Sequence, residues 1–318
     1  MLHKQTQMIA SIFSLLMLLV LTACGQQAGS TAPAAGSETR TVQTAKGEVT
    51  VPVHPKRIVT DLYLADVLAL GIKPVGANEW SLRNPYIKEQ IEGIEDIGAP
   101  ISVEKVLALK PDLIILQSDE NYEKLSMIAP TVVIPYASEG DFYGELRKIA
   151  DVIGQQEKTE EWIASFEQKA AEARKQIEPL VAEGETFGLY ELADGKVWMF
   201  GDNWGRGGQV LYKALQLSPP PIMRELISQG TQYKELAIES LPEYAADNMF
   251  VTTYSAASKG SAPDSFADLQ TNPVWNSLDA VKQKRVFLMD FAMYYADPYA
   301  LESQLQLMVQ KITESHQH

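Results

Sequence analysis

The sequence is poor in the residues that form disulfides and bind metals. Its 318 residues include one cysteine and four histidines, and three of the histidines (His3, His316 and His318) lie near the chain ends. A disulfide framework needs paired cysteines, and Cys-rich zinc sites and all-Cys iron–sulfur clusters usually need four thiolates. These three classes are therefore excluded. His54 alone does not provide the cluster of interior imidazoles that a metal site or general-base chemistry needs.

Basic residues and catalytic motifs are also scarce. Lys and Arg number 27 against 41 Asp and Glu, which gives a formal net charge of −14. A protein that grips nucleic-acid phosphates needs an excess of cations, so we expect no nucleic-acid partner. The sequence has no G-x-S-x-G elbow and no H-E-x-x-H pair, which argues against the common hydrolases. An extracytoplasmic hydrolase that uses paired carboxylates stays open as an alternative, as does a purely structural lipoprotein.

The N-terminus carries a short apolar run. Residues 8–21 are apolar except for two serines, and this run is shorter than the roughly 20 residues that span a membrane. It leads into LTACG (residues 21–25), which resembles the lipobox of bacterial lipoproteins. We therefore expect residues 1–23 to be a signal peptide and Cys24 to be lipidated; a buried free cysteine is the alternative. Residues 24–40 are small and polar and predict a flexible tether.

The rest of the chain alternates short apolar runs with helical patterns, which favours an α/β fold built from parallel βαβ units. The expected strands are residues 57–60, 73–76, 112–116, 131–135, 186–190, 197–200, 249–253 and 285–289, and a final helix is expected over residues 298–313. With 46% apolar residues, the chain can bury one large core or two medium ones.

One long helical pattern divides the two strand series. It runs from Asp151 to about Glu178 with no glycine between Gly154 and Gly184, which predicts a helix of about 40 Å at 1.5 Å per residue. The predicted organisation is an N-terminal α/β lobe (41–150), a bridging helix (151–184) and a C-terminal α/β lobe (185–318).

The two series resemble each other. Glu104 and Asp112 in the first series correspond to Glu239 and Asp247, which lie 135 residues later, and LGIKP (70–74) corresponds to LQLSP (215–219), which lies 145 residues later. This favours two similar lobes, each with a central parallel sheet, and a ligand cleft between them. A chance similarity between βαβ segments is the alternative.

The segment 197–211 is the richest candidate for a binding loop. An aromatic strand with Trp198 leads into a turn with three glycines, from which the side chains of Trp204 and Arg206 are expected to stand out. Arginine donates to paired oxygens and tryptophan covers apolar surface, so the pair suits a ligand with an oxygen-rich pole and a carbon-rich body. Core aromatics with a surface ion pair are the alternative. A phosphate loop is also conceivable, although the GK[ST] of a P-loop is absent.

Further candidates follow other expected strands. Trp80 and Arg83 lie in the loop after the strand that ends at Gly76, and Tyr254 and Tyr294 follow two strands of the second series. If these strands are parallel, their carboxyl ends share one edge of a sheet, so these side chains would face the same cleft. Buried tyrosines with satisfied hydroxyl groups are the alternative.

Several segments together resemble a known family. PKRIV (55–59), LALGIKPVG (68–76), the stretch from VE (103–104) to LKPDLII (109–115) and NWGRG (203–207) are similar to segments of the substrate-binding lipoproteins of ATP-driven iron–siderophore importers, and within these of the ferric-hydroxamate binders. The resemblance implies two α/β lobes bridged by one long rigid helix, with little hinge closure and no enzymatic activity. It implies that Trp204 and Arg206 contact the siderophore, with Trp198 and Tyr294 as further contacts. It also implies that Glu104 and Glu239 dock on the transmembrane permease, which works with a cytoplasmic ATPase.

Charge favours one class of ligand. Iron(III) bound by three hydroxamates is about neutral, whereas iron(III) with three catecholates carries about −3 and favours three or more cations. The expected loops offer Arg83, Arg206 and Lys259, which fits a hydroxamate or mixed hydroxamate and carboxylate siderophore. A ferric catecholate, haem or cobalamin is the alternative within the same importer class. The iron is held by the siderophore, so no protein metal site or cofactor is expected. A monomer is expected, anchored on the outer face of the cell membrane of a Gram-positive bacterium.

Overall fold

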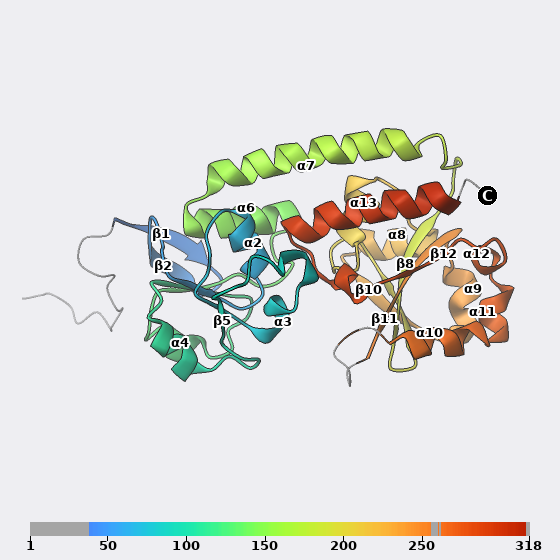
Figure 1. The fold of residues 1–318 in the computed structure, drawn as a ribbon. Helices are drawn as coiled ribbons and strands as arrows, with labels where there is room; N and C mark the ends of the chain where they lie inside the picture. The colour runs from blue at the N-terminus through green and yellow to red at the C-terminus, as the bar shows by residue number, and fades with distance from the viewer. Residues whose placement is uncertain (1–37, 256–259, 261, 316–318) are drawn as a thin grey trace, which may run out of the picture.

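The protein has two α/β lobes side by side, joined along one edge by long helices (Figure 1). The computed structural model describes residues 38–255, 260 and 262–315. The predicted signal peptide, Cys24, Lys259 and all but the end of the predicted tether lie outside these residues. The two lobes confirm the predicted fold class.

The N-terminal lobe is built on a parallel sheet in the order β5-β4-β3-β6-β7. Its strands are β3 (Ile58–Thr60), β4 (Gly76–Ala77), β5 (Glu95–Asp96), β6 (Leu113–Leu116) and β7 (Thr131–Val133), and its helices are α2 (Leu64–Ala69), α3 (Glu79–Leu82), η1 (Pro85–Ile87), α4 (Val103–Leu109), α5 (Tyr122–Leu125) and α6 (Phe142–Ile153). Strands β3, β6 and β7 are buried along their whole length, as expected for parallel strands covered on both faces.

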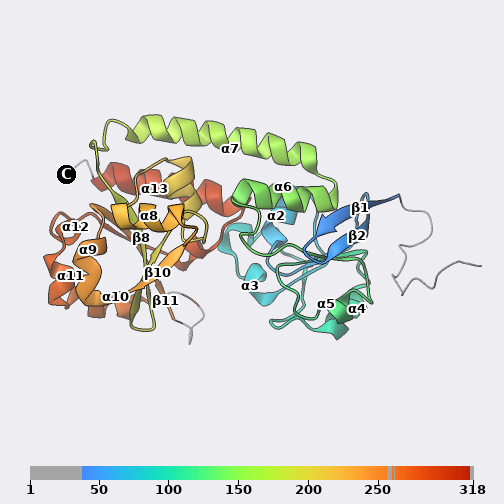
Figure 2. The same ribbon diagram turned by 180° about the vertical axis from the view of Figure 1, so that it is seen from behind.

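A small hairpin stands outside this sheet. Strands β1 (Thr39–Thr44) and β2 (Gly47–Pro52) pair antiparallel with each other, at the outer end of the N-terminal lobe (Figure 2). Because β1 begins at Thr39, ordered structure starts slightly before the predicted end of the tether at residue 40.

The C-terminal lobe has a mixed sheet in the order β10-β9-β8-β11-β12. Its strands are β8 (Phe187–Ala193), β9 (Lys196–Phe200), β10 (Tyr233–Leu236), β11 (Asn248–Tyr254) and β12 (Val286–Met289), and its helices are η2 (Gln209–Ala214), α8 (Pro221–Ser228), η3 (Ile238–Ser240), α9 (Leu241–Tyr244), α10 (Pro263–Gln270), α11 (Pro273–Ser277), α12 (Asp279–Lys282), η4 (Phe291–Tyr294) and α13 (Pro298–Ser315). Strands β8, β11 and β12 are parallel, as predicted.

Strand β9 corrects the prediction of parallel units throughout, because it pairs antiparallel with both β8 and β10. The reason is local. Asp194 and Gly195 both have positive φ angles, 49° and 79°, and an Asp-Gly pair of this kind forms the two-residue turn that suits the twist of a hairpin.

The bridging helix α7 (Gln156–Ile177) begins later than the predicted start at Asp151. Residues 151–153 instead belong to the end of α6, because Gly154 takes the left-handed conformation (φ 74°) that caps that helix. At 1.5 Å per residue, the 22 residues of α7 span about 33 Å.

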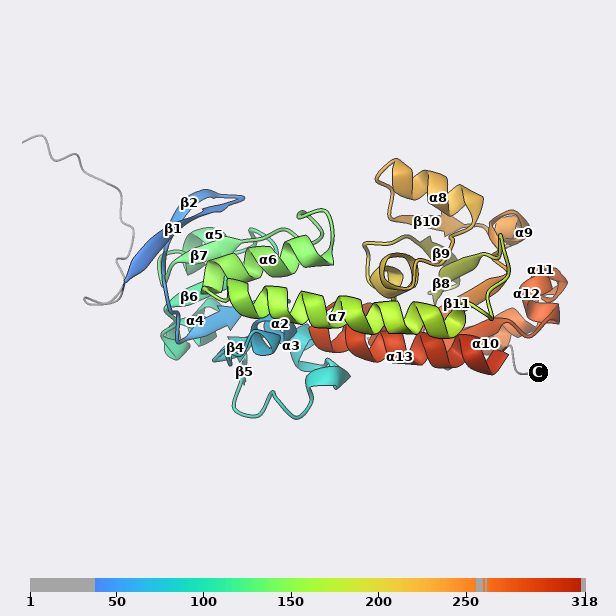
Figure 3. The same ribbon diagram turned by 90° about the horizontal axis from the view of Figure 1, so that it is seen from above.

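A second helix lies along the first. Helix α13 packs against α7 and η2 and also reaches α2 and η1 of the N-terminal lobe; Figure 3 shows the two long helices side by side. Glu302 of α13 accepts a hydrogen bond from the indole of Trp162 (3.2 Å) and forms an ion pair with Lys169 (2.8 Å), both on α7. The lobes are therefore connected by more than the single predicted helix.

The repeated Asp residues have the same structural role in each lobe. Asp112, just before β6, accepts hydrogen bonds from the backbone N–H groups of Lys56 and Arg57, which lead into β3. Asp247, just before β11, accepts one from the backbone N–H of Thr186, which leads into β8. In each lobe the carboxylate fixes the start of one central strand against its parallel neighbour, which explains why the two segments resemble each other.

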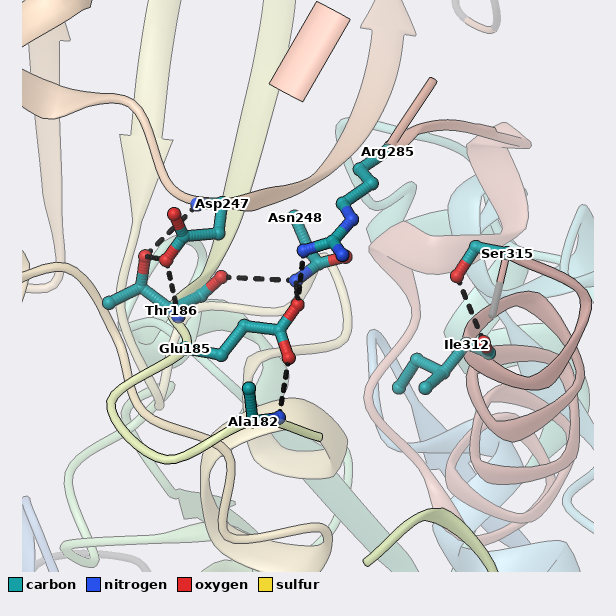
Figure 4. Close-up of polar contacts among 8 residues, drawn as sticks. All are labelled: Ala182, Glu185, Thr186, Asp247, Asn248, Arg285, Ile312 and Ser315. Atoms are coloured by element: carbon teal, nitrogen blue, oxygen red, sulfur yellow. Dashed lines mark hydrogen bonds and ion pairs between the residues drawn. The ribbon is translucent and has the colours of Figure 1, made fainter. Parts of the chain in front are cut away.

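A polar network holds the amino ends of the C-terminal strands together (Figure 4). The Glu185 carboxylate pairs with Arg285 (2.6 Å) and accepts hydrogen bonds from the Asn248 side chain and the Ala182 backbone, both at 2.8 Å. Arg285 and Asn248 come from the starts of β12 and β11, so the network ties three neighbouring strands at the edge of the sheet away from the cleft.

Candidate functional site

The site lies between the lobes, at the carboxyl ends of the parallel strands, where ligands of α/β proteins usually bind. Two adjoining cavities, of about 370 Å³ and 560 Å³, share Trp80, Arg206 and Tyr294 in their walls. We call the first the inner cavity and the second the outer cavity. Trp80 follows β4 and Tyr294 follows β12, so both lobes contribute to the same space.

Six of the seven predicted ligand-binding residues line these cavities. They are Trp80, Trp204, Arg206 and Tyr294 in the inner cavity and Trp80, Trp198, Arg206, Tyr254 and Tyr294 in the outer one. Arg83 lines neither cavity. It is exposed on the surface, and its guanidinium carbon lies 5.4 Å from the ring centre of Trp80, which places it beside the site.

The Arg206 side chain was predicted to stand out of the glycine turn, but it is instead held by other side chains. Its Nε donates to the Glu191 carboxylate (2.9 Å) and its Nη1 to the carbonyl oxygen of Trp204 (3.3 Å). The guanidinium carbon lies 3.9 Å from the ring centre of Tyr294 and 4.4 Å from that of Phe200. With the Arg206 side chain 18% exposed and that of Glu191 6% exposed, the cation is fixed before any ligand arrives.

Tyr294 completes this arrangement. Its hydroxyl group donates a hydrogen bond to the same Glu191 carboxylate, and burial, more than any charge, raises the pKa of Tyr294. The tyrosine therefore stays protonated and keeps its donor role.

The turn beside Tyr294 requires a glycine at position 205, because a Cβ atom on Gly205 would lie 2.7 Å from the carbonyl oxygen of Tyr294.

Aromatic and polar contacts cross the cleft. The ring of Trp204 meets that of Tyr136 from the N-terminal lobe edge-on at 5.5 Å, and the side-chain amide of Asn203 donates to the Gly140 carbonyl (3.1 Å). The Tyr295 hydroxyl group donates to the carbonyl oxygen of Trp80 (3.2 Å). These contacts fix the separation of the cleft walls.

Three carboxyl groups in the inner cavity were not predicted. They are Asp66 of α2, Glu145 of α6 and Asp297 just before α13. Burial is the largest cause of a raised pKa in all three: that of Asp66 is well above its usual value, that of Glu145 is raised to about 7 and that of Asp297 to about 6. The sequence signal for Asp66 is a charged residue inside an apolar helical run, and the same signal marks Glu191 inside an apolar strand.

The two predicted docking glutamates lie on the surface of different lobes. Glu104 is in the first turn of α4, and Glu239 is in η3; both are exposed. Their positions relative to β6 and β11 match, because each precedes the strand-fixing aspartate of its lobe by eight residues.

The described part of the chain shows no group of three or more His, Cys, Asp or Glu side chains arranged to hold a metal ion. None of its helices is both long and apolar enough to cross a membrane.

The chain is similar to known binding proteins. Residues 58–293 match the family model described as periplasmic binding protein. The chain is 41% identical over 300 residues to the iron(3+)-hydroxamate-binding protein YxeB of Bacillus subtilis, covering 92% of each chain, and 35% identical over 322 residues to the iron(3+)-hydroxamate-binding protein FhuD of the same organism, covering 98% of this chain and 99% of FhuD. A crystal structure of a FhuD-fold binding component of a ferrichrome ABC transporter from Bacillus subtilis superimposes with a TM-score of 0.77 at 35% identity, covering 86% of this chain and all of that chain.

Proposed function

Because the chain belongs to the periplasmic binding protein family, we propose that it is the extracytoplasmic receptor of an ABC importer and that its cargo is a ferric siderophore. The cargo is of the hydroxamate or mixed hydroxamate and carboxylate type and is delivered unchanged to a membrane permease for iron uptake. The observation that carries this proposal is the fixed guanidinium of Arg206, set among aromatic side chains from both lobes at the junction of the two cavities.

The side chains divide the work of recognition. Arg206 donates charge-assisted hydrogen bonds to the oxygens that coordinate the iron, since such bonds are stronger than neutral ones. The aromatic rings cover the carbon-rich body of the ligand; they are those of Trp80, Trp198, Trp204, Tyr254 and Tyr294. Iron remains bound by the siderophore and is cargo, so no protein atom replaces its ligands.

The charge of the inner cavity argues for a neutral complex. Its wall holds one guanidinium, that of Arg206, against the three carboxyl groups of Asp66, Glu145 and Asp297. An iron–triscatecholate complex carries about −3 and would be repelled at short range by Asp297, whose pKa of about 6 leaves it mostly ionised at neutral pH. A ferric trihydroxamate carries about zero charge and meets no such penalty.

Two further parts of the proposal concern the membrane. Cys24, in its lipobox-like context, anchors the chain to the outer face of the membrane through a lipid. Glu104 and Glu239 set the docking register on the permease, one from each lobe. Support comes from their exposure and from their equivalent positions in the two lobes.

Titration of tryptophan fluorescence tests the cargo, because Trp80, Trp198 and Trp204 all line the cavities. The chain from residue 25 onward is titrated with ferrioxamine, ferrichrome, ferric schizokinen, a ferric triscatecholate, haem and cobalamin. We expect saturable quenching at micromolar or lower concentration by a hydroxamate complex and none by the triscatecholate. Saturation by only the triscatecholate, haem or cobalamin would overturn the ligand class, and silence from all six would overturn the receptor function.

Uptake of radioactive iron tests the docking residues. We expect the double variant Glu104→Ala and Glu239→Ala to bind cargo normally and to lose uptake. The matched control is Glu157→Ala with Glu161→Ala on the exposed side of α7, which should retain both. Normal uptake by the first variant would remove these two glutamates from the docking surface.

A further inference from the structure

A third cavity lies beside the inner cavity, and the proposed function does not use it. Its volume is about 420 Å³, and it shares Asn78 and Gln117 with the wall of the inner cavity. We call it the side cavity. Asp61, Asn78, Gly98 and Gln117 in its wall come just after β3, β4, β5 and β6. The side cavity therefore lies at the carboxyl edge of the N-terminal sheet, where α/β proteins usually bind ligands.

Gln117 has a fixed backbone and an open side chain. Its backbone N–H donates to the Asp61 carboxylate (2.8 Å), and the other oxygen of that carboxylate accepts from the backbone N–H of Leu62 (2.5 Å). Gln117 is half-buried, and its side-chain amide forms no hydrogen bond with any residue that the structure describes. Asp61 therefore holds Gln117 at the junction of the two cavities, while the amide oxygen and nitrogen stay available to a ligand.

Asn78 adds an open donor at the same junction. Its Oδ1 accepts a hydrogen bond from the backbone N–H of Ser81 (2.9 Å) and so caps α3. This bond fixes the orientation of the Asn78 side chain. Its Nδ2 has no acceptor among the described residues, so it can donate to a ligand that reaches the side cavity.

The side cavity offers donors and acceptors but no cation. The described residues of its wall include no lysine or arginine, and its two carboxyl groups are those of Asp61, which is already hydrogen-bonded, and of the exposed Glu120. A ligand arm that ended in a carboxylate would find no opposite charge there. An amide is uncharged and carries one C=O and one N–H, which match the open groups of Asn78 and Gln117.

We propose that the side cavity binds an uncharged, amide-bearing part of the siderophore framework, with Gln117 as its main hydrogen-bonding partner. This inference rests on the proposed function and assigns the two lobes different tasks. Arg206 of the C-terminal lobe contacts the oxygens around iron, and Gln117 of the N-terminal lobe contacts the organic framework that joins the hydroxamates. The receptor then distinguishes ferric trihydroxamates by their frameworks as well as by their iron centres.

A pair of ligands that share an iron centre tests the proposal. Ferrichrome carries its three hydroxamates on a cyclic hexapeptide, whereas iron(III) tris(N-methylacetohydroxamate), kept intact by excess free hydroxamate, has the iron centre without a framework or an N–H group. We expect Gln117→Leu to weaken ferrichrome binding about five- to tenfold, as the loss of one or two neutral hydrogen bonds would, and to change binding of the bare centre by less than about twofold. The control Gln176→Leu, at an exposed position on α7, should leave both affinities unchanged.

A second variant and a second readout cover poor folding of Gln117→Leu or weak binding of the bare centre. Ser118 is exposed and lines the side cavity, so Ser118→Tyr should fill the cavity and weaken ferrichrome binding without removing Gln117. In the unmodified chain, NMR of glutamine side-chain amides with gallium(III) ferrichrome, which is diamagnetic, should show a shifted Gln117 resonance and an unshifted Gln176 resonance.

The outcomes separate this inference from the function on which it rests. Unchanged ferrichrome affinity in both variants, or a Gln117 resonance that does not shift, would overturn the side cavity as a binding site and leave the receptor intact. Equal losses of affinity for both ligands would place Gln117 at the iron centre and also overturn it, as would failure of ferrichrome alone to bind. Failure of every hydroxamate complex to bind the unmodified chain would instead count against the proposed function.

Discussion

Two glutamate–arginine pairs lie at opposite ends of the same strand, and their surroundings differ. Glu185 and Arg285 meet at 2.6 Å before the start of β8, and Glu191 and Arg206 meet at 2.9 Å near its carboxyl end. Both glutamates are almost fully buried, with side chains 4% and 6% exposed. The first pair is surrounded by backbone and amide groups that complete a structural network. The second pair is surrounded by aromatic rings and borders both cavities. The Glu185–Arg285 pair therefore stabilises one edge of the sheet, whereas the Glu191–Arg206 pair presents a cation to the cavities at the other edge.

The largest expected effect is on stability, at the structural pair. Arg285→Ala leaves Glu185 buried without its cation, and breaking a buried pair from one side typically costs about 3 kcal/mol. We therefore expect the free energy of unfolding in urea to fall by about that amount, while the dissociation constant for a ferric hydroxamate stays unchanged. A clear loss of affinity would contradict the assignment of this pair to structure alone.

Loss of the Glu191–Arg206 pair should weaken ligand binding as well as stability. Arg206→Ala removes the donors proposed for the iron-coordinating oxygens, and we expect binding to weaken by about 1.5 to 3 kcal/mol, or roughly 10- to 150-fold, in a fluorescence titration. The unfolding free energy should also fall, because Glu191 loses its partner. Unchanged affinity in this variant would remove Arg206 from the site.

Removal of single hydroxyl groups should have smaller effects at the two ends of β8. Tyr294→Phe deletes a donor to Glu191, and we expect a loss of about 1 kcal/mol in ligand binding, because Arg206 is then held less firmly. Tyr212→Phe is the matched control: its hydroxyl group donates to the Phe187 carbonyl (3.1 Å) at the other end of β8. That variant should change stability by a similar amount and leave affinity unchanged; equal losses of affinity would erase the distinction between the two ends.

Glu145 is a buried carboxyl without a cationic partner, and burial is the largest cause of its raised pKa. Its pKa is about 7 in the folded protein against a usual value of 4.5, so the folded state binds this proton more tightly than the unfolded state. The resulting stability is present below about pH 4.5 and is lost as the pH rises towards 7. In Glu145→Gln we expect the drop in unfolding free energy between pH 5 and pH 8 to shrink by about 1 to 3 kcal/mol. An unchanged drop would show that Glu145 titrates normally.

The fold was largely predictable because apolar periodicity and turn residues act locally. Alternating strands and helices predicted the two α/β lobes, and the repeated Asp112 and Asp247 predicted their similarity. The direction of β9 was missed although Asp194 and Gly195 are a hairpin signal. The break at Gly154 was missed for a similar reason, since a glycine near the start of a long helical pattern is also the usual cap of a preceding helix.

The position of a side chain in the cavity walls was predictable where it lies at or just after the end of a strand, as Trp80, Tyr254 and Tyr294 do. The state of Arg206 was not predictable, because its partner Glu191 lies on a strand that only the folded sheet brings beside the glycine turn. The inner carboxyl groups were missed for the same physical reason. Asp66, Glu145 and Asp297 come from three separate helical regions, and their common environment exists only after α2, α6 and α13 have packed together.

The pairing of α7 with α13 has a kinetic consequence. Two helices packed side by side across the gap between the lobes resist bending and twisting more than one helix does, so we expect the cleft to keep its width as cargo enters and leaves. If the cleft is preformed, most molecules are already in the binding-competent state, so little affinity is lost. Capture is then limited by diffusion and orientation rather than by closure of the lobes. Release of cargo by separation of the lobes would have to bend both α7 and α13. We therefore expect the permease to release cargo by displacing the short loops around the cavities.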